Sequence, residues 1–354
     1  MTPRARLRGG ALVLALVALA LMVRWSRSGA GDPVHVLVGP TMGTSFRVLV
    51  AADLAEGELE RVRIVVEERL DRVNRLMSTY DTTSEISRFN RHGSTQPFPM
   101  SAELIEALAM AREVSERSGG AFDATVAPLV EAWGFGPVAG IDGPRAPGPS
   151  ETDLVRLRER LGYERVIVDR AAGTASKTHA ETRVDLSGIA KGYGAEAVSA
   201  GLAELGLTTF LVEVGGELAG VGTRAGRPWR VGIERPDDVP GVWGTVDLTD
   251  EGIATSGDYR DYYEADGVRY AHIIDPRTGR PIIVRGATVS VVHPSAAMAD
   301  AWATALTVLG PDEGYEVARR EGLAAVFVYA VEGGLRSSIT PELGARFTAA
   351  EDAR

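Results

Sequence analysis

The second half of the chain contains many short strand candidates and few helices, and this order limits the possible folds more than any other feature. Segments rich in β-branched and apolar residues predict strands at 165–169, 183–186, 210–214, 229–233, 244–248, 269–274, 287–292 and 324–329. Apolar residues at helical spacing predict helices at 193–205, 297–309 and 314–321. Because strands and helices do not alternate strictly, the pattern predicts an α+β fold with mixed sheets and flanking helices, and not a doubly wound parallel sheet.

The first half contains two strand candidates followed by two long helices. Residues 34–38 and 46–50 alternate between apolar and polar side chains on either side of a glycine-rich turn. Residues 59–77 carry Val and Leu at helical spacing, and a second helix over residues 102–118 ends at two consecutive glycines. Residues 138–150 are rich in Pro and Gly, and they predict a surface loop to which we assign no function.

The N-terminal segment has the pattern of an export signal. Three arginines among the first eight residues precede an uncharged apolar run over residues 9–23. The run is shorter than the ~20 residues of a spanning helix. Ser28-Gly29-Ala30 offers small residues for cleavage, whereas Arg24 and Arg27 fit an uncleaved anchor whose N-terminus stays in the cytoplasm. Both alternatives stay open.

We therefore divide the chain into a signal peptide or membrane anchor over residues 1–31 and a folded domain over residues 32–354. We expect the domain to be exported, either anchored to the inner membrane on its periplasmic side or released into the periplasm after cleavage. The chain of 354 residues is long enough for one large domain or two packed lobes. Its formal net charge of −10 argues against nucleic acid as a partner. The absence of cysteine excludes disulfides, thiolate nucleophiles and zinc–thiolate sites.

The alanine-rich run over residues 299–309 predicts a helix with two oxygen donors on one face. Asp300 and Thr304 stand four residues apart, and positions i and i+4 lie on the same side of a helix. A carboxylate and a hydroxyl are hard donors of the kind that Mg²⁺ accepts alongside substrate phosphates. From spacing alone two other interpretations stay open, with Asp300 as a helix cap and Thr304 bonded to its own backbone.

Two glycine-containing turns present further polar groups. Gly119-Gly120 ends a helix shortly before Asp123. Residues 184–193 run from a strand through a turn at Ser187-Gly188 into a helix, so backbone N–H groups and Lys191 would form an anion site. The alternative is an ordinary helix start with a solvated lysine. The sequence contains neither the glycine fingerprint of dinucleotide-binding folds nor a P-loop.

Taken in order, these segments resemble the ApbE family of FAD:protein FMN transferases. The eight matching motifs lie at 42–44, 77–80, 119–136, 185–193, 214–217, 256–259, 272–279 and 299–306. The resemblance implies an ApbE-like, T-fold-related α+β domain of two packed lobes. Many members of the family carry a lipid-modified cysteine near the N-terminus, which this chain lacks, so any membrane attachment would be through the N-terminal helix.

The resemblance also implies an activity and its site. The enzyme would split FAD and attach FMN through a phosphoester to a Ser or Thr hydroxyl of a target protein, a post-translational flavinylation that releases AMP. Mg²⁺ would be held by Asp300, Thr304 and a backbone carbonyl near Gly188. His272, the only histidine inside a matched motif, is the candidate base. The residues implied to line the FAD site are Met42, Tyr80, Ala121, Phe122, Asp123, Asp185, Lys191 and Ile274.

Physical chemistry supports these roles, although two other functions stay open. A bound Mg²⁺ neutralises charge on a breaking diphosphate, and a base such as His272 helps to deprotonate a weakly nucleophilic hydroxyl. The same metal site would serve a Mg²⁺-dependent FAD pyrophosphatase that releases free FMN and AMP. A non-catalytic FAD-binding protein would instead hold intact FAD without requiring Mg²⁺. The fate of FMN, free or protein-bound, separates the two enzymes.

Overall fold

The computed structural model describes residues 33–135, 148–237, 241–258, 262–265, 268–283 and 286–350. The predicted signal or anchor at 1–31 lies outside these residues, and so does all of the predicted loop at 138–150 except its last three residues. None of the helices in the described part of the chain combines the length and the apolar character that a bilayer crossing requires.

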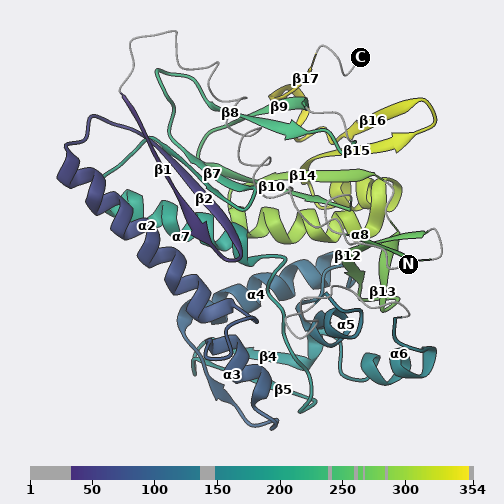
Figure 1. The fold of residues 1–354 in the computed structure, drawn as a ribbon. Coiled ribbons are helices and arrows are strands. Elements are labelled where there is room, and N and C mark those ends of the chain that lie inside the picture. Colours follow the sequence, from purple (N-terminus) through teal and green to yellow (C-terminus); the bar gives the residue numbers. More distant parts are fainter. Residues whose placement is uncertain are drawn as a thin grey trace, which may run out of the picture.

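An antiparallel sheet of eight strands forms the centre of the described part of the chain (Figure 1). Its strands follow the order β1-β2-β6-β7-β10-β14-β15-β16, and every neighbouring pair is antiparallel. The strand bounds are β1 (Val34–Thr41), β2 (Thr44–Ala51), β6 (Phe210–Val214), β7 (Glu217–Val221), β10 (Glu251–Gly257), β14 (Ala287–His293), β15 (Ala324–Val331) and β16 (Gly334–Ile339).

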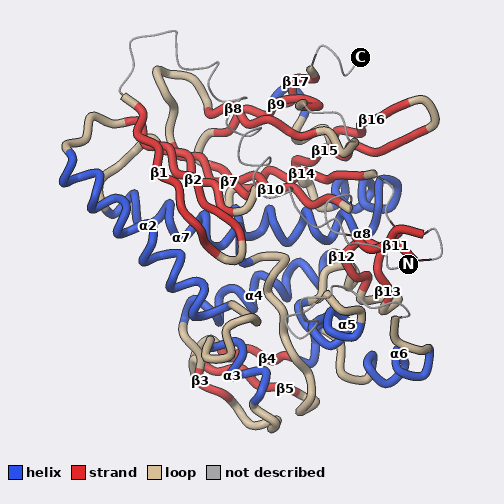
Figure 2. Tube along the Cα trace, in the orientation of Figure 1, coloured by secondary structure: helices blue, strands red, loops and turns tan. Residues whose placement is uncertain are grey.

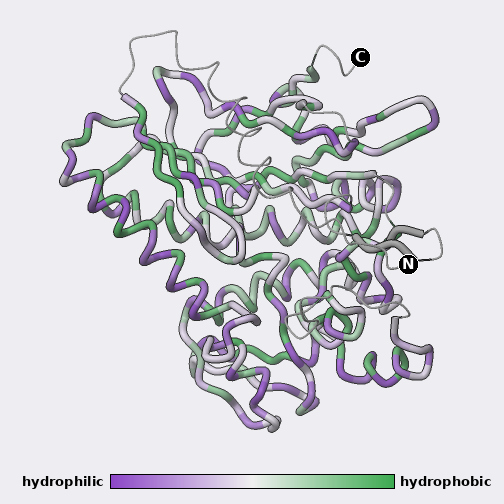
Figure 3. The backbone as a smooth tube through the Cα atoms, viewed as in Figure 1, coloured by the Kyte–Doolittle hydropathy of each residue, from purple (hydrophilic) through white to green (hydrophobic). Residues whose placement is uncertain are grey.

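Three long helices cover one face of this sheet, and a small sheet covers the other, as Figure 1 and Figure 2 show. The helices are α2 (Glu56–Met77), α7 (Ala190–Glu204) and α8 (Ala296–Arg320), and the small sheet contains β17 (Phe347–Ala349), β9 (Val242–Leu248) and β8 (Trp229–Glu234). In β2, Val48 and Val50 pack against α2 and α7, while Leu49 faces the small sheet. The sheet is therefore apolar on both faces, and its strands carry much of the hydrophobic colour in Figure 3.

Most of the remaining elements lie below α8 in Figure 1, whereas the 3₁₀ turn at Gly344–Arg346 leads into β17 of the small sheet. Helix α4 packs on α8 through an apolar cluster that contains Leu104, Leu108 and Trp302. The bounds of these helices, with the short 3₁₀ turns, are α3 (Glu85–Arg91), α4 (Ala102–Arg117), η2 (Ala124–Val126), α5 (Ala127–Ala132), α6 (Glu151–Arg158), η3 (Tyr163–Arg165) and η4 (Gly344–Arg346). The strands are β3 (Phe98–Pro99), β4 (Val166–Asp169), β5 (Thr174–Lys177), β11 (Tyr262–Ala265), β12 (Val268–Asp275) and β13 (Arg280–Ile283).

The predicted α+β class is confirmed, but the sheets differ from the expectation in one respect. Every strand pair within the described residues is antiparallel, so the mixed sheets that we expected are not found there. Several neighbouring strands are joined by hairpin turns of two to four residues, which only antiparallel pairing permits. The helices expected at 297–309 and 314–321 are both parts of α8, which is interrupted by non-helical backbone at Gly310.

The strand predicted at 183–186 is wrong, because the side chain of Asn90 and not a neighbouring strand bonds the backbone there. The Nδ2 group of Asn90 donates a hydrogen bond to the carbonyl of Val184 at 2.8 Å, and the Val184 N–H donates to Asn90 Oδ1 at 2.7 Å. One amide side chain thus supplies both bonds that a neighbouring strand would otherwise make. A second anchor is the N–H of Asp185, which donates to the carbonyl of Ala124 at 2.7 Å.

Replacing Asn90 by alanine is expected to destabilise the fold by about 1–3 kcal/mol, because the N–H and carbonyl of the fully buried Val184 lose their partners. Asn90→Asp keeps the acceptor for the Val184 N–H but turns a second oxygen toward the Val184 carbonyl, so it should lose stability as well. Urea unfolding of the three proteins measures the effect. An unfolding free energy of Asn90→Ala equal to that of the wild type would contradict the role given to this side chain.

Candidate active site

Helix α8 begins with a serine cap, which leaves Asp300 available for another role. The hydroxyl of Ser295 accepts a hydrogen bond from the Met298 N–H at 3.2 Å and so caps the helix. Asp300 stands further inside the helix, is only 2% exposed, and accepts a hydrogen bond from the N–H of Gly192 at 3.0 Å. The interpretation of Asp300 as a helix cap is therefore wrong.

Thr304 lies one turn after Asp300 on the same face of α8. Its hydroxyl is 3.3 Å from the hydroxyl of Ser256 near the end of β10. The backbone of Gly188 packs against it, since a Cβ atom at Gly188 would lie 3.3 Å from Thr304 Oγ1 and 3.0 Å from the ring of Phe122. The structure thus brings Gly188 and Thr304 into contact, with Asp300 on the adjacent turn.

Lys191, in the first turn of α7, extends its ammonium group between two acidic side chains. Its Nζ lies 3.3 Å from Glu217 Oε1 and 3.6 Å from Asp300 Oδ1. Burial alone would lower the pKa of Lys191, but the nearby carboxylates of Asp300 and Glu217 outweigh burial and hold this pKa above its ordinary value. The lysine is therefore not a solvated residue at a helix start, and it keeps its positive charge.

Burial raises the pKa of Glu217 from 4.5 to about 8; the charge of Asp300 adds to this shift, and that of Lys191 opposes it. Between pH 4.5 and about 8 the folded protein therefore binds this proton more tightly than the unfolded chain does. The free energy of unfolding of the metal-free protein should fall as pH rises through this window, by up to ~1.4 kcal/mol per pH unit. The Glu217→Gln variant should lack this pH-dependent part of the unfolding free energy. Denaturant unfolding of both proteins from pH 5 to pH 8 measures the difference, and equal slopes would contradict the assignment.

The oxygen donors at this position suit a hard divalent cation. A carboxylate, a hydroxyl and a backbone carbonyl are ligands that Mg²⁺ prefers to nitrogen or sulfur. Glu217 Oε2 is a further buried acceptor without a hydrogen-bond partner among the described residues. No group of three or more His, Asp or Glu side chains that could hold a metal is found in the described part of the chain, either here or at another position. The carboxylate of Asp300 and the hydroxyl of Thr304, with the backbone of Gly188 against Thr304, form a donor set whose chemistry fits Mg²⁺.

Two hairpin turns lie beside the start of α7. The turn between β1 and β2 places Met42 at a φ of 49°, a left-handed conformation that is uncommon outside glycine. Met42 reaches α7, because a Cβ atom at Gly194 would lie 3.4 Å from its sulfur. The turn between β6 and β7 contains Gly215, where a Cβ atom would lie 3.0 Å from the Cδ of Lys191. The missing side chain at Gly215 leaves the space through which the lysine stem passes.

A pocket of about 270 Å³ opens beside the loop that leads to Gly188. Tyr80 and Asp185 line it, and the tyrosine is 68% exposed, so its ring is accessible to a ligand. Burial, and then the charge of Asp185, raise the pKa of the Tyr80 phenol. Asp185 also accepts a hydrogen bond from the N–H of Ser187 at 2.8 Å, which fixes the loop. The structure thus brings these two predicted FAD residues together in one pocket.

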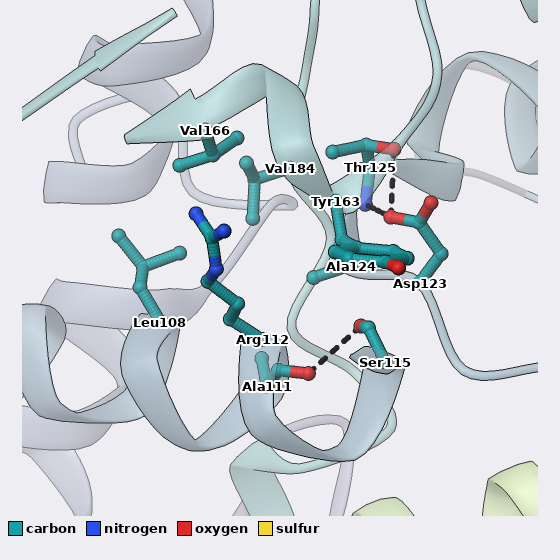
Figure 4. A pocket seen from close by; sticks show the side chains of 10 residues that line it. All are labelled: Leu108, Ala111, Arg112, Ser115, Asp123, Ala124, Thr125, Tyr163, Val166 and Val184. Carbon is teal, nitrogen blue, oxygen red and sulfur yellow. Dashed lines mark hydrogen bonds between the residues drawn. The ribbon is translucent and has the colours of Figure 1, made fainter. Parts of the chain in front are cut away.

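Asp123 lies at the edge of a separate small cavity of about 20 Å³, shown in Figure 4. Its carboxylate accepts hydrogen bonds from the N–H and the hydroxyl of Thr125, both at 2.7 Å, and the ring of Tyr163 lies nearby (Figure 4). Burial raises the pKa of Asp123, although the bonds from Thr125 oppose this shift. Ala121 and Phe122, which precede it, are buried in the largest apolar cluster.

The two remaining predicted residues lie on β12. The side chain of His272 is exposed. The side chain of Ile274 is buried among Leu129, Trp133 and Leu154, so any contact of Ile274 with FAD would have to come from its backbone.

Four polar residues near these positions received no role in the sequence analysis. Glu217 and Ser256 stood inside matched motifs, and their only sequence signal was the glycine beside each of them. Asn90 and Arg183 line the 270 Å³ pocket, where Arg183 forms two hydrogen bonds with Glu131 at 2.9 and 2.6 Å. No spacing rule connects residues so far apart in the chain, so these contacts emerge only from the fold.

The fold and this cluster together define an α+β protein with hard oxygen donors beside a half-buried lysine. Within that class, the chain belongs to the ApbE family, whose model matches residues 42–327. The resemblance inferred from the eight motifs is confirmed.

Similar proteins extend the match over almost the whole chain. The FAD:protein FMN transferase of Vibrio cholerae is 39% identical over 324 residues, which cover 91% of this chain and 95% of the relative. The protein of the same name from Salmonella typhimurium is 40% identical over 317 residues, covering 88% and 89%. The crystal structure of the Pseudomonas stutzeri flavinyl transferase ApbE in its apo form has a TM-score of 0.81 and 35% identity, and covers 91% of this chain and 99% of that one.

Proposed function

We propose that this protein transfers FMN from FAD to a Ser or Thr hydroxyl of a target protein, forming a phosphoester and releasing AMP, with Mg²⁺ as the required metal. The observation that carries the proposal is the contact of Gly188 with Thr304, one turn from the buried Asp300 and beside the ammonium of Lys191. Two relatives of 39% and 40% identity are named FAD:protein FMN transferase, which supports the same activity.

The residues of α7 and α8 would hold the diphosphate bridge at the centre of FAD. Mg²⁺ bound to Asp300, Thr304 and the carbonyl of Gly188 would supply a Lewis acid that neutralises charge on the diphosphate. The ammonium of Lys191 adds a second positive charge beside the same carboxylate. Phosphoryl transfer depends mainly on placement and electrostatic stabilisation, which is what these side chains provide.

His272 would act on the acceptor hydroxyl, which is a weak nucleophile at neutral pH. As the acceptor oxygen bonds to the phosphorus of FMN, the bond from that phosphorus to the bridging oxygen breaks, and AMP leaves with this oxygen. The imidazole of His272 takes the proton of the hydroxyl. Its exposed position on β12 suits a base that must meet a side chain of another protein.

The remaining predicted residues would place the rest of the dinucleotide. The exposed ring of Tyr80 and the thioether of Met42 offer flat or polarizable contacts to an aromatic ring system. Asp185 and Asp123 are acceptors for ribose or adenine donors. The ring of Phe122 packs against Gly188 and so lies next to the proposed metal position.

We also propose that the segment at 1–31 directs export, either as a cleaved signal or as an uncleaved anchor, so that the enzyme modifies targets outside the cytoplasm. The arginine-led apolar run supports this proposal. Expression of the full chain followed by mass spectrometry of the N-terminus and fractionation would separate the two forms. Recovery of the intact chain in the cytoplasmic fraction would contradict both.

The activity can be tested with FAD, Mg²⁺ and a candidate acceptor protein. Transfer predicts an acceptor that carries FMN, seen as in-gel fluorescence and as a mass increase, together with one AMP for each FMN attached. A parallel reaction in which the acceptor lacks its Ser or Thr hydroxyl should give no adduct. Free FMN and AMP formed at equal rates with and without acceptor would identify a pyrophosphatase. Intact FAD under all conditions would identify a binding protein.

Replacement of His272 by alanine is expected to slow FMN transfer by roughly 10²–10⁴-fold, the range typical of general acid–base catalysis. FAD binding, measured by flavin fluorescence, should change little because the residue would act on the acceptor. His92→Ala is a matched control, since that histidine lies at the end of α3, away from β12. An equal loss of binding and of transfer would make His272 a binding residue.

A further inference from the structure

The position of Lys191 raises a question about the proposed metal site. Its Nζ is 3.6 Å from Asp300 Oδ1, so an ammonium group already lies beside the carboxylate that would bind Mg²⁺. Both cations seek the same oxygen atoms. Something must hold the ammonium back if the carboxylate is to accept a metal.

Glu217 is placed to do this. It begins β7 immediately after the turn at Gly215-Gly216, and its Oε1 lies 3.3 Å from Lys191 Nζ, closer than Asp300 Oδ1. The Glu217 side chain is only 5% exposed, and its Oε2 has no hydrogen-bond partner among the described residues. A buried carboxyl group with one unpaired oxygen is costly to keep, which points to a function beyond packing.

We propose that Glu217 is a positioning residue that draws the ammonium of Lys191 away from Asp300 and so keeps that carboxylate open to a divalent cation. The inference rests on the proposed Mg²⁺-dependent function. Gly215 assists, because its missing side chain lets the lysine stem lie across the turn toward Glu217. Without an acceptor at position 217, Asp300 is the remaining acidic partner of Lys191 in the described structure, and their ion pair would close over the metal position.

The test is a calorimetric titration of the metal-free full chain with Mg²⁺ alone. Glu217→Leu is expected to weaken Mg²⁺ binding by about tenfold or more, since a closed ion pair must be opened first. Glu217→Gln retains an oxygen acceptor for the ammonium, so its affinity should stay within about threefold of the wild type. Glu213→Leu is the matched control: Glu213 lies on the same hairpin but pairs with Arg47 instead.

A double-mutant cycle separates positioning from simple loss of structure. In the Lys191→Met background there is no ammonium to hold, so adding Glu217→Leu should change Mg²⁺ affinity by less than about threefold. The proposal is overturned if Glu217→Leu binds Mg²⁺ as the wild type does, if Glu217→Gln is as weak as Glu217→Leu, or if the double variant stays as weak as Glu217→Leu. If Glu217→Leu weakened Mg²⁺ binding only by misfolding, the double variant would stay as weak as Glu217→Leu. That result counts against the proposal.

The outcome also distinguishes this inference from the proposed function. A wild-type chain that binds no Mg²⁺ in the titration would overturn the metal-dependent function and the inference together. A wild type that binds Mg²⁺ and transfers FMN, with Mg²⁺ affinity independent of position 217, would overturn only the role of Glu217.

Discussion

Asp300→Asn is expected to lower the rate of FMN transfer by a factor on the order of 10²–10⁴, a loss as large as the one predicted for His272→Ala. Asparagine has nearly the shape of aspartate and can still accept the hydrogen bond from the Gly192 N–H. It lacks the negative charge that a divalent cation needs and that now faces Lys191. The loss would therefore come from the charge and not from a distorted helix.

The matched control is Asp312→Asn, on the exposed part of the same helix and beyond the break at Gly310. Both variants should unfold at denaturant concentrations close to that of the wild type, while only Asp300→Asn should fail to respond to added Mg²⁺. AMP release and adduct formation are measured at saturating FAD over a range of Mg²⁺ concentrations. Full activity of Asp300→Asn at low Mg²⁺ would remove this carboxylate from the metal site.

Gly192→Ala is expected to damage both the fold and the site. A Cβ atom at Gly192 would lie 2.2 Å from the carbonyl oxygen of Ala296 and 2.9 Å from the Cβ of Asp300. Neither atom can move without shifting α8 away from α7, so the variant should lose roughly 1–3 kcal/mol or more of unfolding free energy. The shift would also break the hydrogen bond from the N–H of residue 192 to Asp300 and displace that carboxylate.

Gly194→Ala provides the comparison, two residues later on the same helix. There the nearest atoms to a new Cβ are the sulfur of Met42 at 3.4 Å and a methyl group of Leu70 at 3.5 Å, which are ordinary contacts. Alanine is favoured over glycine inside a helix by about 1 kcal/mol, so this variant should be at least as stable as the wild type. Thermal unfolding and FMN transfer of the two variants test the contrast. Equal stability of both would show that α7 and α8 are not as closely packed as described.

The sequence predicted the elements whose pattern is local, and it failed where a distant residue decides the structure. Val62, Val66 and Leu70 repeat at helical spacing and form the buried face of α2 as expected. Residues 183–186 do not form the predicted strand, because the backbone groups of Val184 bond to the side chain of Asn90, far away in the sequence. Strand β10 (Glu251–Gly257) was missed because its Gly, Ala and Ser residues have low strand propensity, and pairing with β7 and β14 overrides that preference.

The candidate site shows the same division. The pair of Asp300 and Thr304 could be found from a spacing of four residues on one helix. The role of Lys191 could be expected only as a charge near a helix start, because its two acidic neighbours belong to β7 and α8. Glu217 gave no signal of its own, since a glutamate after two glycines reads as an exposed turn residue. Glu217 is buried only because the β6–β7 hairpin packs against α7.

One short loop contributes to both the pocket and the proposed metal position, since Asp185 lines the 270 Å³ pocket and Gly188 packs against Thr304 three residues later. The anchors from Asn90 and Ala124 leave this loop little freedom to adjust one end independently of the other. Occupation of the pocket by the dinucleotide would thus favour the loop conformation that receives the cation. By thermodynamic reciprocity, each of the two ligands would then increase the affinity of the other by the same factor.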